Sequence, residues 1–339
     1  MTEEPGSDSR RAAIERLFEH GGDINSAMAA FPDAPRPWID LSTGLNPVAY
    51  PVAELPPEVW TRLPAPATLE ALQSVAARAY GAAPECAVAA AGTQAILQIL
   101  PHLFPARRVS ILGPTYEEHA RTWKAAGAEV EIVGDLEAAT AEQVVISNPN
   151  NPDGRIFSRP QMSSYARRLA GEGRQLILDE AFMDFEGQSV AGENLPATIV
   201  LRSFGKAYGL AGLRLGFAMA PPPTAGQLRA ALGPWPVSGP AIAIGSRALA
   251  DKDWLAAARR RLDSDAAWLD GALSRARFEI VGRSRLFRLA RQADAAETFA
   301  RLCSWGILTR PFRRDSALLR FAIPTEDQRP RIADALKLS

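Results

Sequence analysis

The chain has 339 residues, of which 47% are hydrophobic and 22% charged, and its formal net charge is zero. This length exceeds that of a typical single domain and predicts one large and one smaller domain. The neutral charge balance gives no electrostatic reason to expect a nucleic-acid partner or an anionic membrane surface. The composition is that of an ordinary soluble globular protein.

The sequence also lacks the usual signals for export, membrane insertion and metal binding. Residues 1–5 do not combine a basic start with an apolar run, and no stretch approaches the ~20 apolar residues that span a bilayer. Cys86 and Cys303 are isolated, which favours buried free thiols in a reducing compartment. The three histidines are scattered and do not predict a metal site. We therefore expect a cytoplasmic, metal-free protein.

Residues 1–45 are interpreted as an N-terminal arm that packs with the smaller domain. A short helix is expected near Arg11–Glu19, followed by Gly21-Gly22. Asp23 then stands where it could cap a second short helix. Several prolines after residue 30 keep the next segment extended.

From about residue 68 onward, helical spacing alternates with short apolar runs. The helical segments are Leu69–Ala79, Thr93–Leu103 and the region around Glu117–Ala126; the apolar runs are Val88–Ala90, Val109–Leu112, Val130–Val133, Val144–Ile146, Leu176–Leu178 and Thr198–Leu201. Runs of this kind between helices are typical of strands buried on both faces of a sheet. The pattern predicts an α/β fold with a mostly parallel central sheet sandwiched by helices.

The pattern changes after the triple proline at residues 221–223, which we take as the domain boundary. A long helix is predicted over Lys252–Arg275, because leucine and alanine recur there at three- and four-residue intervals. Four strands are predicted at Phe278–Val281, Leu286–Leu289, Ile307–Thr309 and Leu318–Ile323. The expected division is therefore a large domain over 46–223 and a small α+β domain over 224–339.

Lys206 lies in a glycine-rich turn directly after a predicted strand. The spacing does not fit a phosphate-binding P-loop, because the upstream glycine and the hydroxyl residue after the lysine are absent. Ser203 and Arg214 offer a hydroxyl and a guanidinium suited to a phosphate. A lysine near another cation and apolar strand ends loses proton affinity, which favours its use as a nucleophile toward an aldehyde. An ordinary solvated loop lysine is the alternative.

Other polar residues also follow predicted strands. Asp179 ends one strand, where a helix N-cap is the alternative to a buried functional carboxylate. Gly92, Thr93 and Gln94 open a helix, whose free backbone N–H groups suit a phosphate. Tyr116 and Asn151 follow two further strands and could equally be packing and turn residues. In open α/β sheets ligands bind at the strands' carboxyl ends, so these residues predict one crevice.

In this order the residues resemble the fold-type I, class I/II aminotransferase-like family over about residues 36–325. The resemblance implies a pyridoxal 5'-phosphate cofactor bound covalently by Lys206, with Asp179 at the ring nitrogen and Asn151 at the ring hydroxyl. Tyr116 would stack on the ring. Lys206, Asp179 and Tyr116 are the expected catalytic residues, and Gly92, Thr93, Gln94, Ser203 and Arg214 complete the expected cofactor site.

Within this family the chain is most similar to threonine-phosphate decarboxylases of cobalamin synthesis and to histidinol-phosphate aminotransferases. His20-Gly21-Gly22 resembles a motif of the decarboxylases, and Phe182 replaces a tyrosine usual in the aminotransferases. Residues 40–47 resemble the next decarboxylase segment, although Gly44 stands where that group carries an asparagine. The implied substrate-binding residues are His20, Gly21, Gly44, Asn46, Asn151, Arg310 and Arg320.

The resemblance implies decarboxylation of L-threonine O-3-phosphate to (R)-1-amino-2-propanol O-2-phosphate, in a homodimer. O-phosphothreonine carries two anions, which bidentate arginines would bind, although the sequence does not assign Arg310 or Arg320 to either anion. Lys206 would then return a proton to the reacting carbon. Histidinol-phosphate amino transfer, or a related transamination, is the alternative activity. A non-catalytic binding module on the same fold is the alternative of another class.

Overall fold

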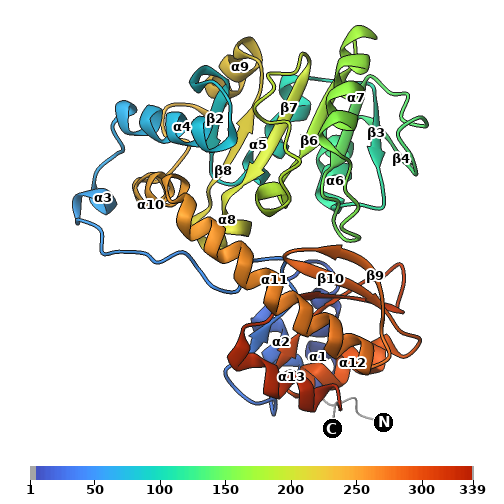
Figure 1. Ribbon diagram of the computed structural model, residues 1–339. Helices are drawn as coiled ribbons and strands as arrows, with labels where there is room; N and C mark the ends of the chain where they lie inside the picture. The colour runs from blue at the N-terminus through green and yellow to red at the C-terminus, as the bar shows by residue number, and fades with distance from the viewer. Residues whose placement is uncertain (1–4, 338–339) are drawn as a thin grey trace. The chain divides into compact units, whose positions relative to one another are not determined.

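The computed structural model describes residues 5–337 and divides into two compact units (Figure 1). Unit 1 contains the described residues up to Val48 together with those from Ala258 onward. Unit 2 contains Ala49–Ala257. The N-terminal segment therefore belongs to the same unit as the C-terminal part of the chain.

Unit 2 is built around a seven-stranded sheet with the order β2-β8-β7-β6-β5-β3-β4. Its strands are β2 Ala87–Ala90, β3 Arg108–Leu112, β4 Glu129–Val133, β5 Gln143–Ser147, β6 Gln175–Asp179, β7 Thr198–Ser203 and β8 Gly216–Met219. Strand β8 pairs antiparallel with β2 and β7, whereas all other neighbours pair in parallel. The predicted mostly parallel α/β sheet is confirmed, and β8 is the strand that the sequence pattern did not reveal.

Helices of unit 2 accompany the sheet (Figure 1). They are α3 Glu58–Thr61, α4 Pro66–Tyr80, α5 Thr93–Leu103, α6 Glu117–Ala125, α7 Arg159–Gly171, α8 Phe204–Ala207, α9 Pro222–Leu232 and α10 Gly239–Ala250. On one face of the sheet, Ile96 of α5, Trp123 of α6 and Leu228 of α9 join Ile177 and Ile199 in a buried core. Burial of one such side chain stabilises the fold by about 1.5–3 kcal/mol.

The division into units differs from the expected domain boundary after Pro223. Pro222 begins α9, where its fixed φ suits the first helical position. Ala225 and Leu228 of this helix are fully buried in the core of unit 2, so the triple proline starts a core helix and does not link two domains. The chain instead passes into unit 1 within α11, which spans Lys252–Arg275 as predicted.

Unit 1 combines two small sheets with helices. A four-stranded antiparallel sheet has the order β12-β13-β10-β9, and β1 pairs in parallel with β11. The strands are β1 Ile39–Asp40, β9 Glu279–Ser284, β10 Phe287–Arg291, β11 Ile307–Leu308, β12 Arg310–Pro311 and β13 Leu318–Ala322; the helices are α1 Pro5–Leu17, α2 Ile24–Ala30, α12 Ala295–Ser304 and α13 Arg329–Ala335. The pairing of β1 with β11 fixes the N-terminal segment to this unit.

The predicted cap of the second helix is confirmed. Asp23 precedes α2, and its Oδ1 accepts a hydrogen bond of 2.9 Å from the backbone N–H of Ser26. This bond satisfies one of the N–H groups that a helix start leaves without an intrahelical partner. The preceding helix ends earlier than expected, at Leu17, so that residues 18–23 form a turn between the two helices.

Candidate functional site

Lys206 lies on α8, the short helix that continues directly from β7. Phe204 and Ala207 on the same turn are buried, and the ring of Phe204 stacks on Tyr208 with centroids 4.4 Å apart. A Cβ added to Gly205 would lie 2.8 Å from the Cα of Ala211, so only glycine allows this close approach. The Nζ of Lys206 lies 4.9 Å from the centre of the Phe182 ring. The lysine is thus presented on a turn whose backbone is packed on both sides.

Asp179 lies at the carboxyl end of β6 and is held by two donors. Its Oδ2 is 3.0 Å from Nε2 of His119 on α6, and its Oδ1 accepts a 3.0 Å hydrogen bond from the Ala181 N–H. The carboxylate is 8% exposed and the histidine is fully buried. Ser147 Oγ lies 3.4 Å from the same His119 nitrogen, and it accepts a hydrogen bond from Thr115. These contacts fix the direction of the Asp179 carboxylate.

His119 was not among the residues expected from the sequence. The available signal was its place in the first turn of the helix after Tyr116, which brings it to the carboxyl end of the sheet. Its Nδ1 is buried and has no hydrogen-bond partner within residues 5–337. The contact with Asp179 joins residues sixty positions apart, and no local pattern predicts it.

Tyr116 lies at the start of α6, with its ring 5.8 Å from that of His119 in an edge-on arrangement. Its hydroxyl is 3.5 Å from Oε1 of Gln94, whose Nε2 donates to Glu118. Burial, and then the negative charges of Glu118 and Asp179, raise the pKa of Tyr116 to about 12. The hydroxyl is therefore protonated at neutral pH and can donate a hydrogen bond.

The start of α5 and the loop before β8 form a cradle of N–H groups. Gly92, with φ +82°, precedes α5, and a Cβ there would lie 2.8 Å from Nη2 of Arg214. Arg214 itself has φ +54°, and its Nη1 donates to the Ala211 carbonyl at 3.3 Å. A Cβ on Gly216 would lie 2.5 Å from the Thr93 nitrogen. Gly92 leaves room for the Arg214 guanidinium at the N-terminus of α5, and Gly216 lets β8 approach the same helix start. A guanidinium at a helix N-terminus suits a phosphate.

The Asn148–Gly154 turn follows β5, and its three asparagines differ in their contacts. Asn148 exchanges two hydrogen bonds with the backbone of Phe157, and Asn150 donates to the Pro114 carbonyl and to Asp153. Both are buried, whereas Asn151 is half-buried. Asn148 and Asn150 therefore stabilise the turn that carries Asn151.

Unit 2 thus brings the expected cofactor residues to the carboxyl ends of β2, β3, β5, β6 and β7. The set contains an amine, a buried carboxylate bound to a histidine, and a cradle of N–H groups with a guanidinium. These groups match an aldehyde, a protonated ring nitrogen and a phosphate, and the residues fit pyridoxal 5'-phosphate on this chemistry. Asn151 is expected to bind both cofactor and substrate. It is the one expected substrate-binding residue that lies in unit 2.

The other expected substrate residues lie in unit 1, where two arginines face each other across neighbouring strands. Arg310 of β12 and Arg320 of β13 are register partners. Arg320 is 7% exposed, lies over the Phe287 ring and donates to the Ser42 carbonyl at 2.8 Å. Burial, followed by the nearby charge of Arg310, lowers the pKa of Arg320 to about 10 against the opposing effect of Asp40. An anion bound between Arg310 and Arg320 would stabilise the charged form of both guanidinium groups.

Arg310 holds the N-terminal motif in place. Its two terminal nitrogens donate to the carbonyls of Leu17 and Glu19, at 3.1 and 2.6 Å, directly before the exposed His20. A Cβ on Gly21 would lie 2.4 Å from the Ser42 carbonyl oxygen, so glycine is required for this approach. His20, Gly21, Arg310 and Arg320 are thereby linked within unit 1.

The remaining expected substrate residues of unit 1 are Gly44 and Asn46. Gly44 is buried. Asn46 is also buried, and its Oδ1 accepts hydrogen bonds from the Val48 N–H and from Arg261. Arg313, which lies near Arg310 in sequence, forms an exposed ion pair with Glu15. These contacts of Asn46 and Arg313 stabilise the local fold.

Over residues 5–337, no helix is both long and apolar enough to cross a membrane. No cluster of three or more histidine, cysteine or acidic side chains that could hold a metal ion occurs in this part of the chain. Cys86 and Cys303 are buried free thiols, as expected from their spacing.

The fold is that of a known class of proteins. The family model for aminotransferase class I and II matches residues 49–336, and the chain belongs to this family. It is 43% identical to a threonine-phosphate decarboxylase of Sinorhizobium sp over 94% of this chain and 97% of that protein. It is 37% identical to a threonine-phosphate decarboxylase of Pseudomonas aeruginosa over 92% and 94% of the two chains.

More distant similarities extend to aminotransferases. A histidinol-phosphate aminotransferase of Geotalea uraniireducens is 29% identical over 90% of this chain and 94% of that protein. Among solved structures, histidinol-phosphate aminotransferase from Sinorhizobium meliloti in complex with pyridoxal-5'-phosphate superposes with a TM-score of 0.81 and 20% identity. The superposition covers 96% of this chain and 95% of that one, and it supports the fold assignment alone.

Proposed function

We propose that the protein is a pyridoxal 5'-phosphate-dependent lyase that decarboxylates L-threonine O-3-phosphate to (R)-1-amino-2-propanol O-2-phosphate, for use in cobalamin synthesis. The observation that carries this choice is the pair Arg310 and Arg320, a double cationic site beside the His20 motif. A substrate with a carboxylate and a phosphate matches two guanidinium groups. The similarity to relatives named threonine-phosphate decarboxylase supports the same reading.

In the proposed reaction, each of the residues described above has a role. When bound, pyridoxal 5'-phosphate supplies the electron sink that accepts the bonding pair released at Cα of the substrate. Asp179, oriented by His119, would stabilise the positive charge on the ring nitrogen of the cofactor. Gly92, Thr93, Ser203 and Arg214 would hold its phosphate, and Tyr116 would pack against its ring. The bond from Cα to the carboxylate breaks, carbon dioxide leaves, and Lys206 delivers a proton to Cα.

The test is incubation of the holoenzyme with O-phosphothreonine in the absence of any keto acid. We expect stoichiometric carbon dioxide and the phosphorylated amino alcohol, and loss of both in Lys206→Ala. The control variant Lys124→Ala alters an exposed lysine on α6 and should retain wild-type turnover. Turnover that requires 2-oxoglutarate and histidinol phosphate would instead support the aminotransferase alternative. That activity is the one for which the 29% identical relative is named.

A non-catalytic binding module is the alternative of another class. It predicts that the protein stays colourless with added cofactor and that borohydride fixes nothing to Lys206. The presence in one unit of Lys206, of the oriented Asp179 carboxylate and of the Arg214 guanidinium at the start of α5 favours a working cofactor site, because a module without catalysis needs no such set.

We further propose that the protein acts as a cytoplasmic homodimer. An apolar groove of about 440 Å³ lies between α3 and α10, lined in part by Leu63 and Ile242. Trp60 and Leu63 are 67% and 69% exposed, and exposed apolar patches of this kind mark association surfaces. Glu58 and Arg62 line the same groove and carry opposite charges, which suit pairing with a second copy of the chain related by a twofold axis. Light scattering should give a dimer mass that Leu63→Glu reduces to that of a monomer.

A further inference from the structure

A buried ion cluster lies at the ends of β6 and β7, next in sequence to the expected cofactor residues Asp179 and Ser203. Arg202 binds two carboxylates: its Nη1 is 2.8 Å from Glu180 Oε2, and its Nη2 is 2.7 Å from Asp184 Oδ1. The three side chains are 3%, 0% and 5% exposed, respectively. Tyr80 covers the guanidinium, with its ring centre 4.5 Å from Cζ. The cluster is therefore shielded from water.

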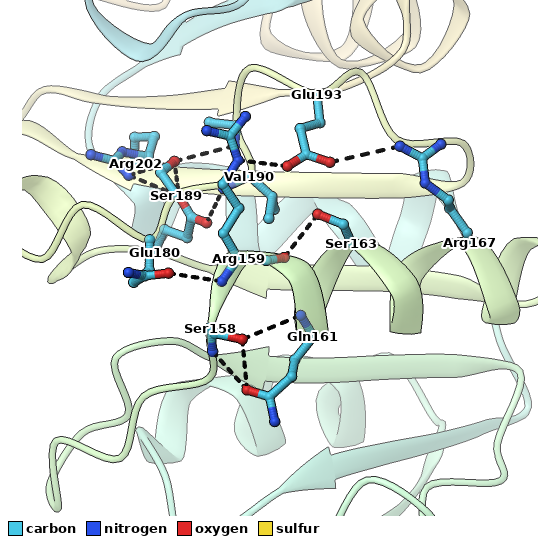
Figure 2. Close-up of polar contacts among 12 residues, drawn as sticks. Ser158, Arg159, Gln161, Ser163, Arg167, Glu180, Ser189, Val190, Glu193 and Arg202 are labelled. Atoms are coloured by element: carbon cyan, nitrogen blue, oxygen red, sulfur yellow. Dashed lines mark hydrogen bonds and ion pairs between the residues drawn. The ribbon is translucent and has the colours of Figure 1, made fainter.

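Glu180 has every part of its carboxylate engaged. Oε2 accepts hydrogen bonds from Arg202 and from the Ser189 hydroxyl, and Oε1 accepts one of 2.9 Å from the Val190 N–H. Figure 2 shows these contacts converging from the segment after β6 and from β7. The Glu180 N–H also donates to the Leu201 carbonyl at 2.9 Å. This residue thus joins three segments of unit 2.

The cluster lies on the opposite face of the sheet from the cofactor residues. Asp179 and Leu201 are register partners, so Asp179, Leu201 and Ser203 share one face. Glu180 directly follows Asp179, and Arg202 directly precedes Ser203. Because successive residues of a strand point to opposite faces, the cluster joins the ends of β6 and β7 on the face opposite to Asp179 and Ser203.

The ion pair between Arg202 and Asp184 also ties the turn after Phe182 to β7. Asp184 belongs to a 3₁₀ turn over Met183–Phe185, which comes directly after Phe182. The Phe182 ring lies 4.9 Å from Lys206 Nζ. Arg202 therefore connects the strand that leads to Lys206 with the aromatic ring packed against that lysine.

Stability alone does not account for such a cluster. Taking charges out of water costs several kcal/mol per ion, and well-packed apolar replacements of buried ion pairs are often equally stable. Here two carboxylates share one guanidinium, which raises the cost further, and burial raises the pKa of Glu180. The several hydrogen bonds and ion pairs that Arg202, Glu180 and Asp184 form do, however, favour a single geometry of the segments that carry these residues.

We propose that Arg202 is a positioning residue, whose contacts with Glu180 and Asp184 lock the ends of β6 and β7 so that Asp179 and Lys206 hold a fixed geometry toward the cofactor. This role rests on the proposed cofactor chemistry of the site but not on the identity of the substrate. Neither Arg202, Glu180 nor Asp184 contacts the reacting atoms in this scheme. They act through Asp179, Ser203 and Phe182.

The variants that test the proposal are Arg202→Lys and Asp184→Asn. Lysine keeps the charge of residue 202 but loses the two-pronged contact that bridges the carboxylates. Asp184→Asn leaves a one-to-one pair of Arg202 and Glu180, which favours folding. Arg288→Lys is the matched control, since Arg288 is a 7% exposed arginine that binds Asp270 through two nitrogens in unit 1.

Three readouts separate positioning from a purely structural role. They are the cofactor Kd of the apoprotein, the visible circular dichroism of the bound cofactor, which reports its fixed orientation, and kcat and KM for O-phosphothreonine. We expect both variants to bind cofactor about 10-fold more weakly and to lose about 10-fold or more in kcat, because small misplacements are costly in such sites. KM should change less than twofold, and the control should match wild type.

The proposal is overturned if folded Arg202→Lys and Asp184→Asn proteins keep the wild-type dichroism, Kd and kcat while only their melting temperatures fall. Should Arg202→Lys not fold, Asp184→Asn decides by the same three readouts. If wild type does not decarboxylate O-phosphothreonine, the proposed function fails while the dichroism and Kd still test Arg202. The two failures are therefore distinguishable.

Discussion

The Nε2 atom of His119 lies 3.0 Å from Oδ2 of Asp179, and both side chains are buried at the carboxyl end of the sheet. The contact joins α6 to β6 and leaves Oδ1 of the carboxylate bound to the Ala181 N–H. A carboxylate held by two donors keeps one orientation more firmly than a solvated one. The pair thus links the helix that follows Tyr116 to Asp179, the residue that we propose for the ring nitrogen of the cofactor.

The first prediction concerns this contact. His119→Ala removes one donor from a buried carboxylate, and such losses cost about 1–3 kcal/mol. We expect a cofactor Kd about 10-fold weaker and a similar fall in kcat, measured by titration of apoprotein and by steady-state assay. His102→Ala, which changes an exposed histidine of α5, should leave both values unchanged. Equal behaviour of the two variants would mean that His119 does not orient Asp179.

The second prediction concerns the phosphate cradle. Gly92→Ala places a Cβ 2.8 Å from Arg214 Nη2 at a residue with φ +82°, so it adds both a clash and backbone strain of about 1–2 kcal/mol. Cofactor affinity should fall at least 10-fold, because the guanidinium is displaced from the start of α5. Gly171→Ala is the control, since a Cβ there meets nothing within 4 Å at the end of α7. Wild-type cofactor binding by Gly92→Ala would refute the assigned cradle.

The third prediction separates stability from substrate binding at Arg320. Burial and the charge of Arg310 lower the pKa of Arg320 to about 10, so its charged form costs stability in the folded protein. Arg320→Met should melt at no lower a temperature than wild type, while KM for O-phosphothreonine rises about 100-fold. The exposed Arg313→Met, which loses an ion pair and a backbone hydrogen bond to Glu15 and a contact with the Phe18 ring, should retain the wild-type KM.

The pH dependence of the same variant follows from the direction of the shift. Because the pKa is lower in the folded chain, the unfolded chain holds more protons above pH 10, and wild type gains stability there as pH rises. The difference in unfolding free energy between Arg320→Met and wild type should therefore shrink above pH 10, as measured by urea denaturation. A constant difference across this range would contradict a perturbed Arg320.

The fourth prediction concerns the cap of α2. The hydrogen bonds from Ser26 lower the pKa of Asp23, so the cap stabilises the folded chain above the ordinary aspartate pKa and this contribution is lost as pH falls through the lowered value. Asp23→Ala should cost about 1 kcal/mol at pH 7 and much less at pH 3 in urea denaturation. Asp33→Ala, at an exposed position, should show no such pH-dependent loss. A loss of equal size at both pH values would contradict the cap.

The strands that carry the site could be predicted because each is a short apolar run followed by a polar residue. Asp179 and Lys206 were accessible in this way, since Asp179 directly follows one such run and Lys206 lies in the glycine-rich turn after another. Strand β8 escaped prediction because Gly216–Met219 is short and pairs antiparallel within an otherwise parallel pattern. The domain boundary was misplaced because prolines that begin a core helix look, in sequence, like a linker.

The contacts that shape the site were not predictable from local sequence. His119 meets Asp179, and Arg202 meets Asp184, only through the order of strands in the sheet. The burial of Arg320 likewise depends on its pairing with β12 and on the Ser42 carbonyl. Sequence patterns identify which residues end strands, whereas charge partners and pKa shifts arise from tertiary packing.

The most direct test of the proposed function compares two reactions on one preparation of holoenzyme. Carbon dioxide release from O-phosphothreonine without keto acid is measured beside amino transfer from histidinol phosphate to 2-oxoglutarate. We predict that kcat/KM for decarboxylation exceeds that for amino transfer by at least about 100-fold, as expected when a site matches one substrate's charged groups. A higher kcat/KM for amino transfer would contradict the assignment of Arg310 and Arg320 to the two anions of O-phosphothreonine.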